Sequence, residues 1–214
     1  MDSALIVGAG RFGMHIARRM SELGCEVMVV DKNEDRINAI LPFVTDARIG
    51  ECTNADFLRT LDIAEFSVCI VTIGDDFQSS LETTSILKDL GARVVVSRAV
   101  NDIQVKFLLR NGADEVVYPE KEMAMRVATK YASNGILDFI QFDGNHSIYE
   151  LALPSEWSGR TLSQLDIRKK YNINIIAVKH EGRVVVPKPD MAFDTSDTLF
   201  ALGELAEIKK CFKI

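Results

Sequence analysis

The residues with the clearest chemical meaning are three glycines near the start of the chain, Gly8, Gly10 and Gly13, spaced as G-x-G-x-x-G. They lie between a short apolar run and an amphipathic segment over residues 14–23, that is, between a predicted strand and a predicted helix. There the first glycine permits a tight turn, the second lets backbone amides approach a pyrophosphate, and the third lets helix and strand pack closely. Free N–H groups at the helix start attract phosphate. The pattern therefore predicts a nucleotide site.

Two charged residues extend this prediction. Asp31 ends the second apolar run, at the distance beyond the glycines that dinucleotide-binding sequences show. A carboxylate at that place accepts hydrogen bonds from ribose hydroxyls and repels a 2′-phosphate, which disfavours NADP. Arg11 stands in the first helical turn, where a cation opposes the helix dipole at a cost of about 0.3–1 kcal/mol. Arg11 either meets phosphate or is an ordinary solvated arginine, and the sequence leaves both interpretations open.

The elements that position these residues alternate between strand and helix through residue 134. The predicted strands cover residues 5–7, 27–30, 47–49, 68–73, 93–97 and 115–118. The predicted helices cover residues 14–23, 34–42, 57–61, 77–90, 102–111 and 119–133. Right-handed connections make this an α/β fold, a Rossmann-type doubly wound parallel sheet ordered 3-2-1-4-5-6.

In such a sheet, ligands bind beyond the carboxyl ends of the strands. Arg11, Asp31, Glu51, residues 73–75 and Arg98 all follow predicted strand ends. We therefore expect them to converge on one crevice.

The pattern changes at Asn134-Gly135, so residues 1–134 and 135–214 are predicted to form separate domains. From Ser147 apolar and polar residues alternate, as in half-exposed antiparallel strands. A short helix to about residue 170, a hairpin turning at 180–183, a strand over 198–202 and a helix over 205–212 complete a small α+β domain. Gly135 to Phe142 is interpreted as a linker that packs, with the preceding helix, against a second subunit.

Residues 135–214 show no acid, base or nucleophile arranged for catalysis, and the chain has no Y-x-x-x-K helix of short-chain reductases. The sequence thus favours nucleotide binding without catalysis. An NAD-dependent oxidoreductase with unidentified catalytic residues remains the alternative.

The composition bears on other classes. The chain is 47% hydrophobic and 26% charged with a net charge of −6, which is typical of a globular protein. The chain has no block of basic residues, so a nucleic-acid partner is not expected. The four cysteines are scattered and predict neither a zinc site nor a disulfide framework. No apolar stretch approaches the length of a membrane-spanning helix, and the start lacks signal-peptide features, so a cytoplasmic location is expected.

Several further stretches resemble those of one known family. They are G-A-G-R-F-G at 8–13, V-V-D at 29–31, G-E-C-T at 50–53, L-K-D-L-G at 87–91, R-A-V-N at 98–101, G-A-D-E-V-V-Y-P-E at 112–120 and E-W-S-G-R-T-L at 156–162. Over essentially its whole length the chain resembles the cytoplasmic RCK (regulator of K⁺ conductance, or KTN) subunits of Ktr/Trk-type potassium uptake systems. Its two halves then correspond to RCK-N and RCK-C domains.

This resemblance implies a nucleotide-sensing regulatory subunit that gates a membrane potassium channel of the KtrB/TrkH-like kind. It also implies a homodimer that assembles into an octameric ring, held at the inner face of the cell membrane by the channel. In the family, ATP favours the conducting state and ADP or NAD(H) modulates it. The sequence does not decide which nucleotide is resident.

The resemblance further implies a set of nucleotide-binding residues. With the glycine-rich turn they are Gly8, Gly10, Arg11, Phe12, Gly13, Asp31, Lys32, Asn33, Glu51, Cys52, Thr53, Ile73, Gly74, Asp75, Arg98, Ala99, Val100, Gln104 and Glu120. Glu120 matches a family glutamate close to the phosphates and a cation, Mg²⁺ or Ca²⁺. Gln104 stands where the family has a histidine, and Glu51 replaces the usual aspartate.

A second ligand, cyclic di-AMP, is implied for the RCK-C half. The matching stretches run from Leu165 to Arg168 and from Asn174 to Ile176. Arg168 would contact phosphate, and Ile167 and Ile175 would pack on adenine beside Asn174. The alternative is a plain helix–strand core with a solvated arginine.

Overall fold

The chain divides into two compact units, Met1–Lys121 and Glu122–Ile214, of which the computed structural model describes residues 3–141 and 145–214. Each unit is described by itself. Across the described residues, no helix is long and apolar enough to cross a membrane.

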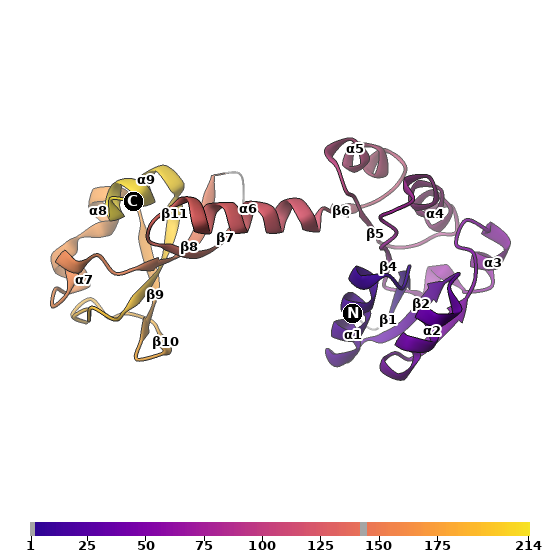
Figure 1. Ribbon diagram of the computed structural model, residues 1–214, viewed down its shortest axis with the longest axis horizontal. Helices are drawn as coiled ribbons and strands as arrows, with labels where there is room; N and C mark the ends of the chain where they lie inside the picture. Colours follow the sequence, from indigo (N-terminus) through magenta and orange to yellow (C-terminus); the bar gives the residue numbers. More distant parts are fainter. Residues whose placement is uncertain (1–2, 142–144) are drawn as a thin grey trace. The chain divides into compact units, whose positions relative to one another are not determined.

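The first unit is built on a six-stranded parallel sheet in the order β3-β2-β1-β4-β5-β6 (Figure 1). The strands are β1 Ser3–Val7, β2 Glu26–Asp31, β3 Asp46–Ile49, β4 Val68–Val71, β5 Val95–Arg98 and β6 Glu115–Val117. The predicted strand order is confirmed. The order reverses between β1 and β4, and doubly wound sheets bind their ligands beside such a reversal.

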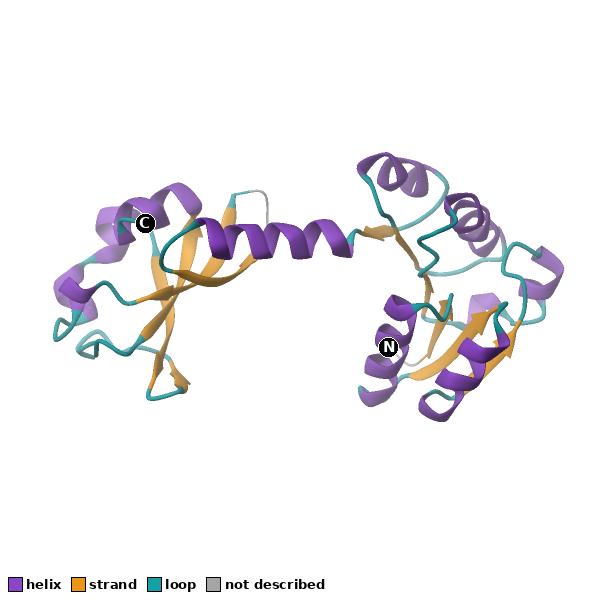
Figure 2. Ribbon diagram, in the orientation of Figure 1, coloured by secondary structure: helices purple, strands orange, loops and turns teal. Residues whose placement is uncertain are grey.

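Helices cover both faces of this sheet (Figure 2). They are α1 Arg11–Glu22, α2 Glu34–Ile40, α3 Ala55–Arg59, α4 Phe77–Asp89 and α5 Asp102–Arg110, with α6 Pro119–Ala132 following β6. Alternate residues of β1 serve opposite faces, because successive side chains of a strand point to opposite sides. Ala4 and Ile6 pack with residues of α1 and α2, whereas Leu5 and Val7 pack with residues of α3 and α4. The central strand is thus buried on both sides.

Four helices of this unit begin at a residue whose side chain accepts a backbone N–H bond, namely Asn33, Asn54, Asp76 and Asn101. Such N-caps satisfy donors that the helix itself leaves free. The predicted cap at Asn33 is confirmed. Helix α1 differs, because its N-cap is Gly10 and no side chain caps it.

Some predicted boundaries in this unit were wrong. The third helix ends at Arg59, so the buried Leu61 reaches the core from beyond it. The fourth strand ends at Val71, before its predicted end. The fifth strand begins at Val95, whose N–H donates to the Asp114 carboxylate. Where a helix or strand begins and ends depends on contacts with residues distant in the sequence, and the periodicity of apolar residues does not reveal such contacts.

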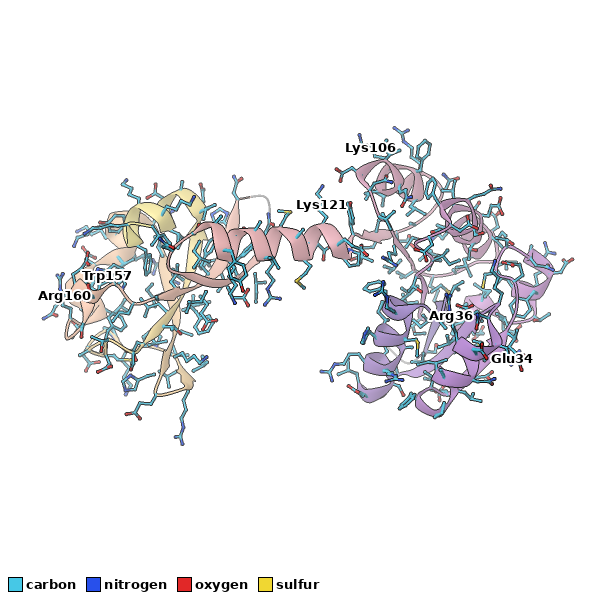
Figure 3. The ribbon with its side chains drawn as sticks, viewed as in Figure 1. Glu34, Arg36, Lys106, Lys121, Trp157 and Arg160 are labelled. Carbon is cyan, nitrogen blue, oxygen red and sulfur yellow. The ribbon has the colours of Figure 1, made fainter. Side chains whose placement is uncertain are left out.

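The second unit holds a five-stranded antiparallel sheet in the order β10-β9-β11-β8-β7. Its elements are β7 Ile136–Gln141, β8 His146–Ala152, α7 Leu162–Leu165, α8 Ile167–Tyr171, β9 Asn174–His180, β10 Arg183–Val185, β11 Thr198–Glu204 and α9 Leu205–Phe212. Its core includes Trp157 (labelled in Figure 3), whose ring centroid lies 4.9 Å from that of Phe212. The predicted α+β character is confirmed.

Two predictions for this unit were wrong. The stretch interpreted as a linker from Gly135 contains strand β7, which pairs with β8 and buries Ile136, while Phe142 lies outside the described residues. The single helix predicted to about residue 170 is two helices, because Asp166 adopts a left-handed φ of 50° between them.

Candidate functional site

A cavity of about 780 Å³ lies beyond the carboxyl ends of β1, β2, β4 and β5. This volume is within the range of small-molecule and cofactor sites. The structure brings most of the predicted site residues into its lining. They are Gly8, Gly10, Arg11, Phe12, Asp31, Lys32, Glu51, Cys52, Ile73, Gly74, Asp75, Arg98 and Glu120.

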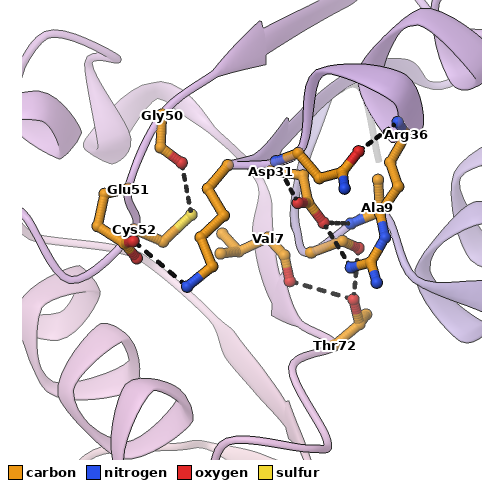
Figure 4. Close-up of polar contacts among 11 residues, drawn as sticks. Val7, Ala9, Asp31, Arg36, Gly50, Glu51, Cys52 and Thr72 are labelled. Atoms are coloured by element: carbon orange, nitrogen blue, oxygen red, sulfur yellow. Dashed lines mark hydrogen bonds and ion pairs between the residues drawn. The ribbon is translucent and has the colours of Figure 1, made fainter.

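Two of the glycines are required by the packing of the turn itself. Gly8 has a left-handed φ of 103°, and a Cβ on Gly13 would lie 2.0 Å from the Gly8 carbonyl oxygen. The Thr72 hydroxyl donates to that same oxygen at 2.7 Å and to the Val7 carbonyl at 3.1 Å (Figure 4). A side chain at Gly8 or Gly13 would therefore break the contact between β1, β4 and the start of α1.

Gly10 is different, because the protein's own packing does not require it. Its φ of −70° is open to any residue, and a Cβ built on it would meet no atom within 4 Å. Its missing side chain instead leaves the start of α1 open toward the cavity. The first N–H groups of a helix have no partner within the helix. This open cradle of backbone donors fits a phosphate group.

Arg11 is the first residue of α1 and is exposed at the cavity. Within the described part of the chain its guanidinium forms no ion pair. Its charge is therefore free for an anionic ligand.

Asp31 connects the end of β2 to the glycine-rich turn. The carboxylate is buried, and its Oδ2 accepts the Ala9 N–H at 2.7 Å while Oδ1 accepts the Asn33 N–H at 2.8 Å (Figure 4). The Arg36 guanidinium lies 3.4 Å from Oδ2. With two donors on Oδ2 and one on Oδ1, Oδ1 can accept a further bond, such as one from a ribose hydroxyl. Asp31 thus holds the turn in place as well as facing the cavity.

The end of the cavity nearest β3 carries another charged pair. Lys32 Nζ lies 3.5 Å from the Glu51 carboxylate, and both side chains are exposed. Beside them, burial raises the pKa of the Cys52 thiol to about 12, with Asp31 and Glu51 adding to the effect. This thiol is therefore protonated and unreactive at neutral pH.

The opposite end of the cavity is formed by Arg98, the last residue of β5. Its guanidinium forms an ion pair with Glu120 in the first turn of α6 and lies 5.5 Å from the centroid of the Phe12 ring. A Cβ on Gly74 would stand 2.6 Å from its Nη1, so a side chain there would displace the guanidinium from this position. Its Nε is buried and has no hydrogen-bond partner among the described residues.

The other predicted site residues lie outside the lining of the cavity. They are Gly13, Asn33, Thr53, Ala99, Val100 and Gln104. Gln104 Oε1 accepts the Val100 N–H at 2.9 Å, which fixes the loop after β5. A direct role of these six residues toward a ligand stays a prediction.

Sequence reasoning missed several residues of the lining, namely Ala9, Met14, His15, Arg36, Gly50, Thr72, Asp76 and Ser79. Thr72 could have been predicted from the sequence, because it is a hydroxyl residue in an otherwise apolar run at the end of a strand. Arg36 could not have been predicted in this way, since its approach to Asp31 depends on how α2 packs.

A second, smaller cavity of about 190 Å³ lies in the second unit. It brings together Ile167, Arg168, Asn174 and Ile175, the residues predicted for cyclic di-AMP. It is also lined by Leu162, Ser163, Asp166, Ile173 and Pro189.

A glycine-rich turn between β1 and α1, an acidic residue at the end of β2 and a cavity at the strand-order reversal define a Rossmann-type nucleotide-binding domain. Residues 4–119 match the TrkA-N domain and residues 147–214 match the TrkA-C domain. The chain belongs to the TrkA-N/TrkA-C family of RCK proteins.

Sequence relatives support this family assignment. The chain is 39% identical over 206 residues to the Ktr system potassium uptake protein C of Bacillus subtilis (strain 168), covering 96% of this chain and 93% of the relative. It is 33% identical over 206 residues, with the same coverage, to the Ktr system potassium uptake protein A of that strain. The GsuK channel shares the fold, with a TM-score of 0.71 at 20% identity over 97% of this chain and 38% of that chain.

Proposed function

We propose that the protein is a nucleotide-sensing regulatory subunit of a potassium uptake system, without catalytic activity. It is cytoplasmic and lies at the inner face of the cell membrane, bound to a potassium channel subunit of the KtrB/TrkH-like kind. The observation that carries this proposal is the open cradle at Gly10, which the chain's own packing leaves unexplained. Similarity to potassium uptake proteins over 96% of the chain supports the regulatory role.

We propose ATP and ADP as the ligands, with NAD(H) as the alternative. The phosphates bind at the start of α1, the ribose at Asp31, and the base near Lys32 and Glu51. Arg11 meets the γ-phosphate that distinguishes ATP from ADP. Glu120 and phosphate oxygens together hold Mg²⁺ or Ca²⁺, hard cations that prefer oxygen ligands. The GsuK channel, of the same fold at 19% identity and a TM-score of 0.68, binds NAD.

We propose a homodimer, assembled into an octameric ring, as the working form. Helix α6 exposes an apolar face whose members are Met123, Val127 and Tyr131, at 55%, 48% and 79% exposure. They recur at every fourth position, so they lie on one side of the helix. A second copy of α6 covers this face.

We place the boundary between the two functional domains at residues 134/135, so that α6 belongs to the nucleotide-binding domain, because this helix begins at the nucleotide cavity.

Cyclic di-AMP is proposed as a second ligand, at the smaller cavity. Arg168 offers a cation to its phosphates, and Ile167 and Ile175 offer apolar surface to its adenines. The cavity of one chain is small for such a ligand, so two copies share it.

The experiment that tests these proposals is a thermal-shift comparison of ATP, ADP, NAD⁺, NADH and cyclic di-AMP. A ligand at about 100 times its Kd stabilises the native state by about 2.7 kcal/mol, which raises Tm measurably. Absence of a shift with ATP, ADP and NAD(H) alike would refute nucleotide sensing. Consumption of NADH with a panel of small carbonyl compounds would instead favour the oxidoreductase.

A further inference from the structure

The nucleotide cavity contains an ion pair that stands in the way of its own ligand. Arg98 is a cation of the lining, and its guanidinium sits over the ring of Phe12, a residue of the glycine-rich turn where a phosphate would bind. Yet this guanidinium is already paired with the carboxylate of Glu120. A carboxylate and a phosphate repel each other, so they cannot both keep the same close partner without a cation between them.

Arg98 is also built for more than this one contact. The guanidinium has five N–H donors, and the bond to Glu120 uses Nη2. Nε is buried and unpartnered among the described residues, although a buried donor is normally satisfied. Gly74 leaves the space that the guanidinium occupies, and the side chain is 18% exposed against 55% for Glu120. Arg98 is therefore the fixed member of the pair and Glu120 the replaceable one.

We propose that the Arg98–Glu120 pair is a latch that nucleotide phosphate opens: phosphate takes Arg98, and Glu120 at the start of α6 leaves Arg98, free to share a divalent cation with the phosphate or, where no such cation is present, to face solvent. This rests on the proposed nucleotide binding and adds how binding is read out. Glu120 directly follows Pro119, where α6 begins, and the residues after Lys121 belong to the second unit. The latch thus couples the phosphate site to the first turn of the helix that leads out of the nucleotide unit.

The test is a double-mutant cycle on ADP affinity, measured by calorimetry with EDTA present so that no divalent cation screens the carboxylate. Glu120→Gln removes the competitor and is expected to tighten ADP about fivefold in the Arg98 background. In the Arg98→Gln background the same change is expected to tighten ADP less than about twofold. Adenosine, which lacks phosphate, is expected to bind all variants alike.

A matched control is the neighbouring pair of Lys121 Nζ and Asp102 Oδ1, 2.6 Å apart, which joins the same turn of α6 to α5 (Lys121 is labelled in Figure 3). Neither residue lines the cavity. The cycle of Lys121→Gln with Asp102→Asn is expected to leave ADP affinity unchanged.

A second test of the latch measures amide hydrogen exchange at the start of α6 and needs only a substitution of the exposed Glu120. Amide hydrogen exchange over residues 118–126 is expected to rise when ADP binds the wild type, and to be raised already in Glu120→Gln without ADP. The latch would be refuted if ADP binds but the effects of the Arg98 and Glu120 substitutions on its affinity are additive. It would also be refuted if amide exchange in Glu120→Gln without ADP equals that of the wild type. Neither result would contradict nucleotide binding itself. Failure of ADP, ATP and NAD(H) to bind the wild type would refute nucleotide binding itself.

Discussion

Replacing Asp31 tests whether this carboxylate holds the glycine-rich turn in place, apart from any ligand. Asp31→Ala removes the acceptor of the Ala9 N–H, which is buried, and of the Asn33 N–H, which is partly buried. A buried donor left without a partner costs about 1–3 kcal/mol, whereas a partly buried one is partly rescued by water. We therefore expect the unfolding free energy to fall by about 2 kcal/mol, of which Ala9 accounts for most.

The assay is thermal and urea unfolding without nucleotide. For a unit of about 120 residues, 2 kcal/mol corresponds to a fall in Tm of about 8 °C. Asp75→Ala is the matched control, since Asp75 is an exposed carboxylate of the same cavity and its removal is expected to change stability by less than about 0.5 kcal/mol. Equal stability of the two variants would refute the structural role of Asp31. Affinity for ATP and NAD that matches the wild type would refute its ribose contact.

Three further predictions concern other parts of the chain. Arg11→Ala is expected to reduce the ATP-over-ADP preference more than it weakens ADP; equal loss for both nucleotides would make Arg11 a general binding residue. Val127→Asp is expected to convert the proposed dimer to monomer in sedimentation, and an unchanged profile would exclude this face of α6 as the dimer contact. A hydrogen bond from His180 to Asp197, at 2.7 Å, raises the pKa of His180 above its ordinary value. Its contribution to stability is thus complete below about pH 6.5 and lost as pH rises through the raised pKa, so His180→Gln should flatten the decline in urea stability between pH 6 and pH 9.

The fold was largely predictable from the sequence, because its decisive features are local. Apolar runs of strand length separated by helical segments fix the alternation of elements, and right-handed crossovers together with the glycine-rich turn after the first strand favour the Rossmann order 3-2-1-4-5-6. Gly8, Gly10 and Gly13 stand at a strand–helix junction, and that context is written in adjacent residues. Strand β7 escaped prediction, since its pairing with β8 is what makes residues 136–141 a strand.

The internal contacts of the site were less predictable. The bonds of Thr72 to the Gly8 carbonyl and of Arg98 to Glu120 join residues 64 and 22 positions apart. Spacing along the chain carries no record of such contacts. The sequence likewise predicted a ribose role for Asp31 but not its bond to the Ala9 N–H, because that bond exists only once β1 and β2 are side by side.

The central claim, that phosphate binds at the open start of α1, is tested most directly by Gly10→Ala. A methyl group at Gly10 meets no atom of the protein within 4 Å, so the variant is expected to fold with wild-type stability. The same methyl group projects where backbone amides must approach the phosphates. Calorimetric titration with ADP is therefore expected to show at least a tenfold loss of affinity, about 1.4 kcal/mol, in a fully folded protein. Wild-type ADP affinity in Gly10→Ala would contradict the claim.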